Sequence, residues 1–169
     1  TDYFPRETKR GGAWMNNFVN QEVVDGVDIR PVIVNVGNFA KPVDGKPSLL
    51  TLDQVETLFH EYGHALHGLL SKCHYKSVAG TSVARDFVEL PSQNMENWAF
   101  EPEVLATYAR HYETGEVIPA ELVNKIVESS KYGQGFATVE YLAASLSDMD
   151  LHVLTEIPAD LNVMDFEQK

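Results

Sequence analysis

The sequence has a single cysteine, Cys73, which excludes a disulfide within the chain and is compatible with a reducing compartment. It also lacks an apolar run approaching the roughly 20 residues that a membrane-spanning helix needs. Basic residues are scarce, since 13 Lys and Arg face 25 Asp and Glu and leave a formal charge of −12. This negative charge disfavours nucleic acid and anionic membranes as partners. We therefore expect a cytoplasmic protein with no nucleic-acid, membrane or obligate protein partner.

Apolar residues are plentiful enough for one sizeable core, because 44% of the 169 residues are hydrophobic and 22% are charged. Residues 1–47 are broken by glycine and proline into short segments that suit strands. Residues 48–169 carry the longer helical patterns. We expect a mainly α (α+β) fold in which residues 1–169 form a single unit, with a small N-terminal sheet followed by helices.

Two segments of the first region have the composition of strands. They are residues 13–19, which are aromatic and apolar, and residues 31–38, which read PVIVNVGN. Glycines at 11 and 12 precede Trp14, and they could let a peptide backbone approach the strand and pair with it. They could equally mark a bulge or a turn.

A long helix is predicted over residues 51–71. Thr51 and Gln54 form a capping box, and Asp53 suits the positive end of the helix dipole. The helical period places one apolar face opposite the polar one, made of Val55, Leu58, Phe59, Tyr62, Leu66, Leu69 and Leu70. We expect this apolar face to pack against the rest of the protein.

The polar face of this helix carries the HEYGH run, with His60, Glu61 and His64. Residues four apart lie one turn apart on the same side of a helix, so both imidazoles can reach one metal ion. This is the HEXXH arrangement of zinc peptidases, in which the glutamate is the general base. The alternative is a helix with two surface histidines and no metal.

Four further helices follow in the pattern. The first of these, which is the second helix of the chain, begins close to Glu89, where Pro91 is acceptable in the first turn. The others are predicted over residues 102–113, residues 119–132 and residues 136–155.

A catalytic zinc usually has three protein ligands and a water, so HEXXH needs a third donor. A metzincin would continue with a glycine and a histidine where this chain has His67 and Leu70, which excludes that class. The carboxylates that follow are Asp86, Glu89, Glu96, Glu101 and Glu103. Glu89 is favoured because it begins a helix that can pack on the first, although a first-turn glutamate can also serve only the helix dipole.

Three other expectations concern the surroundings of the site. Glu56 lies one turn before His60, and we expect it to pair with Arg85 and so support the metal ligands. His67 shares the face of the motif and could line the cleft, although a structural role is favoured. The remaining histidines have no partner at metal-ligand spacing and are interpreted as structural: His74, His111 and His152.

Several stretches together resemble the thimet oligopeptidase family of zinc metallopeptidases. They are LFHEYGHALHGLL (residues 58–70), GTSVARDFVELPSQ (80–93), ENW (96–98), KRGGAWMNNF (9–18) and RPVIVNVGNF (30–39), of which the last two look most like the bacterial peptidyl-dipeptidase branch. The resemblance implies zinc as the cofactor, with His60, His64 and Glu89 as its ligands and Glu61 as the general base. It also implies a longer, mainly helical enzyme that hydrolyses short peptides in a deep channel, either by releasing C-terminal dipeptides or by oligopeptidase cleavage.

The family places a histidine and several tyrosines in a glycine-rich loop that binds the oxyanion and the substrate. That loop comes after the part of the family to which this chain corresponds, and residues 131–135 are only superficially similar to it. The resemblance therefore implies a catalytic-core fragment that hydrolyses peptides weakly or not at all. The alternative function is a non-catalytic module that binds zinc or a peptide.

Overall fold

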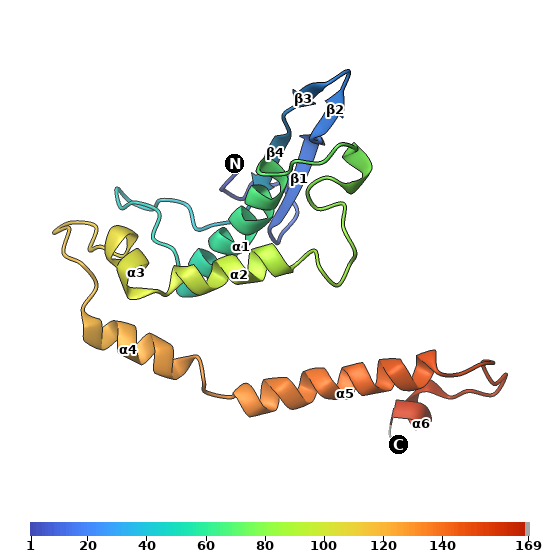
Figure 1. Cartoon of the computed structure of the whole chain (residues 1–169). Coiled ribbons are helices and arrows are strands. Elements are labelled where there is room, and N and C mark those ends of the chain that lie inside the picture. Colours follow the sequence, from blue (N-terminus) through green and yellow to red (C-terminus); the bar gives the residue numbers. More distant parts are fainter. Residues whose placement is uncertain (168–169) are drawn as a thin grey trace. The chain divides into compact units, whose positions relative to one another are not determined.

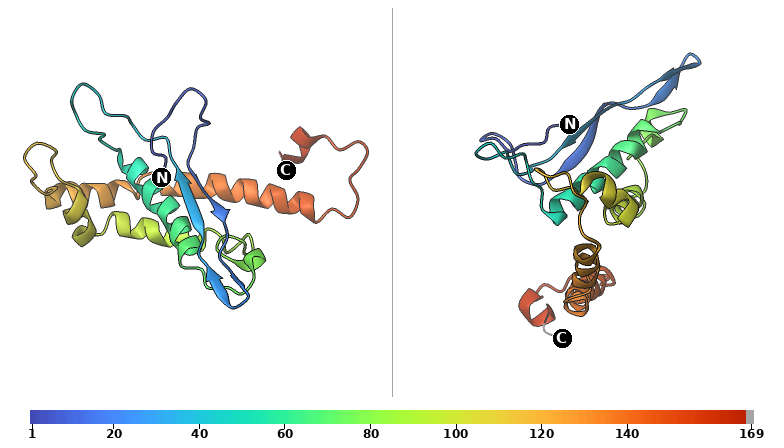
Figure 2. Two further views of the ribbon diagram at one scale, coloured as in Figure 1. Left: turned by 90° about the horizontal axis from the view of Figure 1, so that it is seen from above. Right: turned by 90° about the vertical axis from the view of Figure 1, so that its left-hand side faces the viewer.

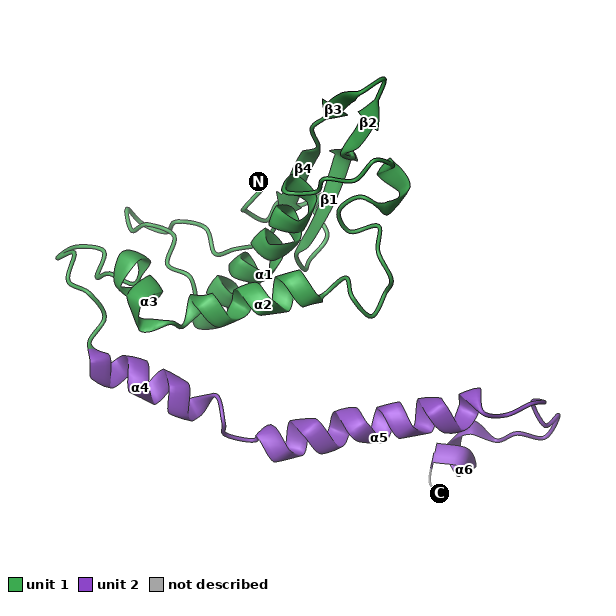
Figure 3. Cartoon of the chain, viewed as in Figure 1, with its two compact units in different colours: residues 1–119 green, residues 120–169 purple. Residues whose placement is uncertain are grey.

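The computed structural model describes residues 1–167 and contains two compact units, residues 1–119 and the residues from 120 onward (Figure 3). In the described residues, helices make up most of the regular structure, and the four short strands all lie near the N-terminus in unit 1. The expected mainly helical fold with a small N-terminal β region is confirmed. None of the helices in residues 1–167 is long and apolar enough to cross a membrane. Residues 168 and 169, part of the predicted single unit, lie outside the described residues.

Both predicted strands are present, as β1 (Trp14–Val19) and β4 (Val32–Val36). They pair antiparallel with Trp14 opposite Val36, and β4 is the only strand that pairs with β1 among residues 1–167. The chain between them forms a hairpin of β2 (Glu22–Val24) and β3 (Val27–Ile29), which extends from the end of the β1–β4 pair (Figure 1). Its two-residue turn, Asp25-Gly26, has positive φ at both positions, as a type I′ turn requires.

The long helix α1 (Leu52–Leu69) begins where the sequence predicts. The Thr51 hydroxyl accepts a hydrogen bond from the Gln54 amide at 3.3 Å, and the Gln54 side chain accepts one from the Thr51 amide at 3.2 Å. This capping box satisfies amides that the helix itself leaves without acceptors, and it fixes the start of the segment that carries the HEYGH run.

The predicted apolar face of α1 is partly wrong. Tyr62, Leu69 and Leu70 are exposed, whereas the buried positions of the helix are mostly small or polar: Glu61, Gly63, His64, Ala65 and Gly68. The reason is that α1 packs at close range against two neighbours, the β1–β4 sheet and the helix α2 (Leu90–Ala99) (Figures 1 and 2). Close packing of backbones favours glycine and alanine over large side chains.

The two buried glycines of α1 show this directly. A Cβ atom added to Gly63 would lie 2.6 Å from the Ser92 Cα and 2.7 Å from the Pro91 carbonyl oxygen, both in α2. A Cβ atom added to Gly68 would lie 2.7 Å from the Ile33 side chain of β4. The middle of the HEYGH run therefore sets how closely α2 approaches the motif.

We predict that Gly63→Ala destabilises unit 1 by about 1–3 kcal/mol, because the added methyl group meets backbone atoms that cannot rotate away. Urea unfolding followed by tryptophan fluorescence checks this, since both tryptophans, Trp14 and Trp98, lie in unit 1. Gly11→Ala is the matched control, because nothing lies within 4 Å of its added Cβ. Equal unfolding midpoints for the two variants would contradict the close contact.

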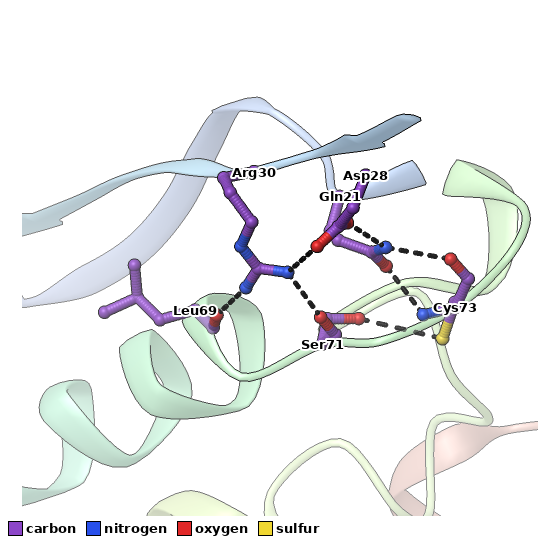
Figure 4. Close-up of polar contacts among 6 residues, drawn as sticks. All are labelled: Gln21, Asp28, Arg30, Leu69, Ser71 and Cys73. Atoms are coloured by element: carbon purple, nitrogen blue, oxygen red, sulfur yellow. Dashed lines mark hydrogen bonds and ion pairs between the residues drawn. The ribbon is translucent and has the colours of Figure 1, made fainter. Parts of the chain in front are cut away.

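The end of α1 is held by Arg30, which follows β3 (Figure 4). Its guanidinium donates to the Leu69 carbonyl oxygen, to the Ser71 carbonyl oxygen at 3.2 Å, and to the Asp28 carboxylate at 2.9 Å. The last carbonyls of a helix have no partner within the helix, and a cation suits the negative end of the dipole. The β2–β3 hairpin thus anchors the C-terminal end of α1.

The neighbouring Gln21, which is only 1% exposed, joins the same hairpin to the chain after α1 (Figure 4). Its amide nitrogen donates to the Cys73 carbonyl oxygen at 2.9 Å and to the Asp28 carboxylate at 2.8 Å, and its oxygen accepts from the Cys73 amide at 2.7 Å. The backbone at residue 73 is therefore fixed against the hairpin, and the chain continues through a short 3₁₀ turn (Lys76–Val78).

The later helices agree with the predictions except in two places, the end of the third helix and an additional short helix near the end of the chain. They are α3 (Pro102–Tyr108), α4 (Ala120–Ser129), α5 (Gln134–His152) and the short α6 (Val163–Glu167). The prediction that α3 extends to residue 113 is wrong, because the chain turns back after Tyr108 and the backbone at Arg110 bridges to Val117. The His111 Nδ1 accepts the amide of Thr114 at 3.2 Å, which stabilises this turn in place of a further helical turn.

Candidate active site

Two histidines of the HEYGH run lie one turn apart on α1, and their rings meet edge to face with centroids 4.9 Å apart. His64 is 9% exposed, and burial lowers its pKa from the ordinary value while the Glu89 carboxylate opposes that shift. A lowered pKa keeps the imidazole neutral near pH 7. Neutral imidazole is the form that can bind a metal through a nitrogen lone pair.

Glu89, the residue immediately before α2, contacts both histidines. Its Oε2 atom lies 3.2 Å from His60 Nε2 and 3.0 Å from His64 Nε2. The Ser92 hydroxyl donates to the same carboxylate at 2.8 Å, and this hydrogen bond lowers the pKa of Glu89, with the two histidines adding to the shift. Glu89 is thus held ionised and aimed at the two imidazoles.

The three donor atoms suit one tetrahedral zinc ion. They all lie within 4.8 Å of one another, and two imidazole nitrogens with one carboxylate oxygen form a donor set typical of catalytic zinc. Bonds of about 2.0–2.1 Å at tetrahedral angles place neighbouring donors about 3.3 Å apart, close to the 3.0 and 3.2 Å found between Glu89 and the two histidines. The residues present therefore fit the metal that the motif implies.

Glu61 lies between the two histidines in sequence and is 8% exposed. Its Oε2 atom is buried and has no hydrogen-bond partner among the described residues. Burial raises the pKa of the Glu61 carboxyl, His60 opposes the shift, and the Glu89 carboxylate adds to it. The Asn35 side chain donates to the Glu61 backbone carbonyl at 3.0 Å, so β4 fixes the backbone of this residue. Such a carboxylate is well suited to take a proton.

The expected pair of Glu56 and Arg85 is absent from the ion pairs of the described residues, and that prediction is wrong. Glu96 of α2 instead contacts the motif, with its Oε1 atom 2.5 Å from His60 Nδ1. Glu56 lines the same opening as Glu96, and burial and then the Glu96 charge raise the pKa of Glu56. Sequence reasoning considered Glu96 only as a possible ligand. Its seven-residue separation from Glu89, about two helical turns, is the signal that places both on one face.

An open pocket of about 340 Å³ gives access to the cluster. Its lining joins the motif and Glu89 to the start of β1 and to the loop after α1: Ala13, Trp14, Met15, His60, Glu61, His64, Thr81, Val88 and Glu89. A second opening of about 380 Å³ lies beside it, over Glu56 and Glu96. The start of β1, a strand that pairs only with β4 among residues 1–167, therefore borders the histidine and carboxylate cluster.

The other candidates lie outside this cluster. His67 is half-buried against Phe87 and lines a different pocket of about 480 Å³. In the described part of the chain, only His60, His64 and Glu89 come together as a metal-binding group. The remaining candidates are elsewhere: His74, Asp86, Glu101, Glu103, His111 and His152.

Comparisons with known proteins agree with this geometry. The sequence model of peptidase family M3 matches residues 1–168. The chain is 49% identical over 168 residues to a dipeptidyl carboxypeptidase of Salmonella typhimurium, covering 99% of this chain and 24% of that protein. It is 48% identical over 153 residues to oligopeptidase A of the same organism, covering 89% and 22%.

A plant protein, the organellar oligopeptidase A of Arabidopsis thaliana, is 40% identical over 166 residues, covering 95% of this chain and 21% of that protein. The chain thus spans about a quarter of the length of the curated relatives it matches.

Proposed function

The chain belongs to peptidase family M3, the thimet oligopeptidase family, and on that premise we propose that it carries the zinc site of an enzyme that hydrolyses peptide bonds in short peptides. The observation that supports this most is the convergence of His60, His64 and Glu89 beside the buried carboxylate of Glu61. Peptides, rather than nucleic acids or membranes, are the proposed partners, in keeping with the charge of −12.

In this proposal, His60, His64 and Glu89 hold the zinc ion. A bound zinc ion supplies Lewis acidity, which polarises a scissile carbonyl group and makes water more acidic. Glu61 then takes the proton of the attacking water and passes it to the leaving amine, so no covalent intermediate with the protein is needed. Its raised pKa places this carboxyl nearer to neutral pH, where a general base is most effective.

We propose that the substrate lies along the free side of β1. An extended peptide can add to such a strand through backbone hydrogen bonds. Ala13, Trp14 and Met15 line the same pocket as the motif, so a peptide paired there would pass beside Glu61. The more specific proposal is release of C-terminal dipeptides, which the similarity to a dipeptidyl carboxypeptidase supports. The alternative is internal cleavage, which the similarity to oligopeptidase A would support. A product assay distinguishes the two.

We also propose that the 169-residue chain alone turns over peptides slowly. The described lining of the pocket contains no Lys, Arg or Tyr, so donors that would stabilise a developing oxyanion are few, with Thr81 and Trp14 as the side chains available. Loss of one such donor typically lowers kcat by about 10²–10³-fold. Hydrolysis is therefore best followed with enzyme in excess of substrate.

A chelation experiment tests the proposal. We expect the chain to retain one zinc after dialysis and to cleave a blocked, fluorescence-quenched peptide slowly, with loss of cleavage on addition of 1,10-phenanthroline and recovery on addition of equimolar zinc. Mass spectrometry of the products separates dipeptide release from internal cleavage. A chain that binds no zinc would contradict the proposal, and a chain that binds zinc and peptide without any cleavage would be the non-catalytic module.

A further inference from the structure

Both ring nitrogens of His60 face carboxylates that come from one segment, the start and the body of α2. Its Nε2 atom lies 3.2 Å from Glu89, and its Nδ1 atom lies 2.5 Å from Glu96. A carboxylate only accepts hydrogen bonds when it is ionised, so Nδ1 is the donor in this contact. In the neutral imidazole the proton is then on Nδ1, and Nε2 presents its lone pair toward Glu89 Oε2.

The Nε2 and Glu89 lone pairs face one point, which is unfavourable unless a proton or a metal ion lies between them. The contact with Glu96 therefore does more than pack the ring, because it selects the tautomer and the ring orientation in which Nε2 is free for a metal ion. Resting on the proposed function, we propose that Glu96 is the positioning residue of the zinc site, which fixes His60 as a ligand through its Nδ1–H.

The two histidines differ in this respect. The Nδ1 atom of His64 is buried without a hydrogen-bond partner among the described residues, so burial, with the side chain 11% exposed, and the contact of Nε2 with Glu89 hold that ring. The His60 side chain is 25% exposed, so packing constrains its ring less than that of His64. The hydrogen bond to Glu96 is therefore the main constraint on the His60 ring. Removing Glu96 should consequently disturb His60 while leaving His64 in place.

The close approach of α2 to α1 explains how Glu96 reaches His60. Gly63 lets the backbone of α2 lie against the motif, and Glu89 and Glu96, two turns apart, then reach the same imidazole. One helix thus supplies a metal ligand and the group that orients another ligand. Outer groups of this kind typically contribute about 10–100-fold to metal affinity.

Zinc affinity, measured by competition with a chromophoric chelator, tests the proposal. We expect Glu96→Ala to weaken zinc binding by about 10–100-fold, and Glu96→Gln to weaken it less, because its amide oxygen can still accept from Nδ1. Glu56→Gln is the matched control, since it removes a neighbouring charge at the same opening, and Glu56 forms no ion pair or hydrogen bond with His60 among the described residues. Its affinity should stay close to that of the parent chain.

A second readout needs no metal. In ¹⁵N NMR of the metal-free chain, recorded at a pH where the His60 imidazole is neutral, His60 should be the Nδ1–H tautomer in the parent and should lose that preference in Glu96→Ala, while His64 is unchanged. Equal zinc affinity of the parent and Glu96→Ala, or an equal loss in Glu56→Gln, would overturn the proposal. A parent chain that binds no zinc would instead overturn the proposed function, and the tautomer of His60 would still show whether Glu96 orients the ring.

Discussion

Replacing Glu61 by glutamine is expected to lower the rate of peptide hydrolysis by about 10²–10⁴-fold, the usual contribution of a positioned general base. Glutamine has the size of glutamate and cannot accept the proton of the attacking water. The side chain is not among the three donors that converge on the metal position. Zinc content should therefore remain that of the parent chain while hydrolysis is lost.

The measurement is single-turnover cleavage of a quenched peptide, together with zinc content by atomic absorption. Glu103→Gln is the matched control, because Glu103 is an exposed carboxylate of α3 outside the cluster. A Glu61→Gln chain that cleaves at the parental rate would show that another group takes the proton. A parallel loss of zinc would show that Glu61 binds the metal.

The second large effect is expected from Glu89→Ala. This change removes the only carboxylate oxygen of the donor group in the described residues, so zinc binding should weaken by more than the roughly 100-fold that marks the upper range for groups outside the ligand set. The fold should persist, because the Glu89 side chain is 48% exposed and the contacts it loses, to Ser92 and to the two histidines, all lie within the site.

Zinc titration and far-UV circular dichroism of the same samples separate the two possibilities. An unchanged dichroism spectrum with strongly weakened zinc binding is the expected outcome, with Glu103→Ala as the control for the removal of an acidic side chain. If Glu89→Ala binds zinc as the parent does, Glu89 is not a ligand. Glu89 would then have the alternative role given in the sequence analysis, in which its carboxylate only interacts with the positive end of the α2 dipole.

Local signals in the sequence predicted the parts of the fold that depend on neighbouring residues. Thr51 and Gln54 specify the start of α1 through two hydrogen bonds within one turn, and the strand at residues 32–36 follows from its β-branched run. The β2–β3 hairpin was not predicted, although Asp25-Gly26 between apolar residues is a strong hairpin signal. The helix cap, the β-branched run and the turn are each specified by a few consecutive residues, so they can be identified without knowing the tertiary structure.

Contacts between distant segments were harder to predict. The helical period places Tyr62 and Leu69 on one face, but it does not show that the sheet and α2 approach α1 through its glycines, which leaves those large side chains exposed. The prediction that Glu56 pairs with Arg85 was wrong for the same reason, because it also depended on contacts between distant segments. Which acidic or basic side chain meets the motif depends on the packing of α2 on α1, and that packing brings Glu96 to His60.

The most direct test of the account is to locate zinc in crystals of the zinc-loaded chain by anomalous diffraction at the zinc absorption edge. The account predicts one anomalous peak about 2.0–2.2 Å from His60 Nε2, His64 Nε2 and a Glu89 carboxylate oxygen, with Glu61 facing the remaining side of the ion. A peak at other histidines, such as His74 or His152, or no peak at the HEYGH run, would contradict it.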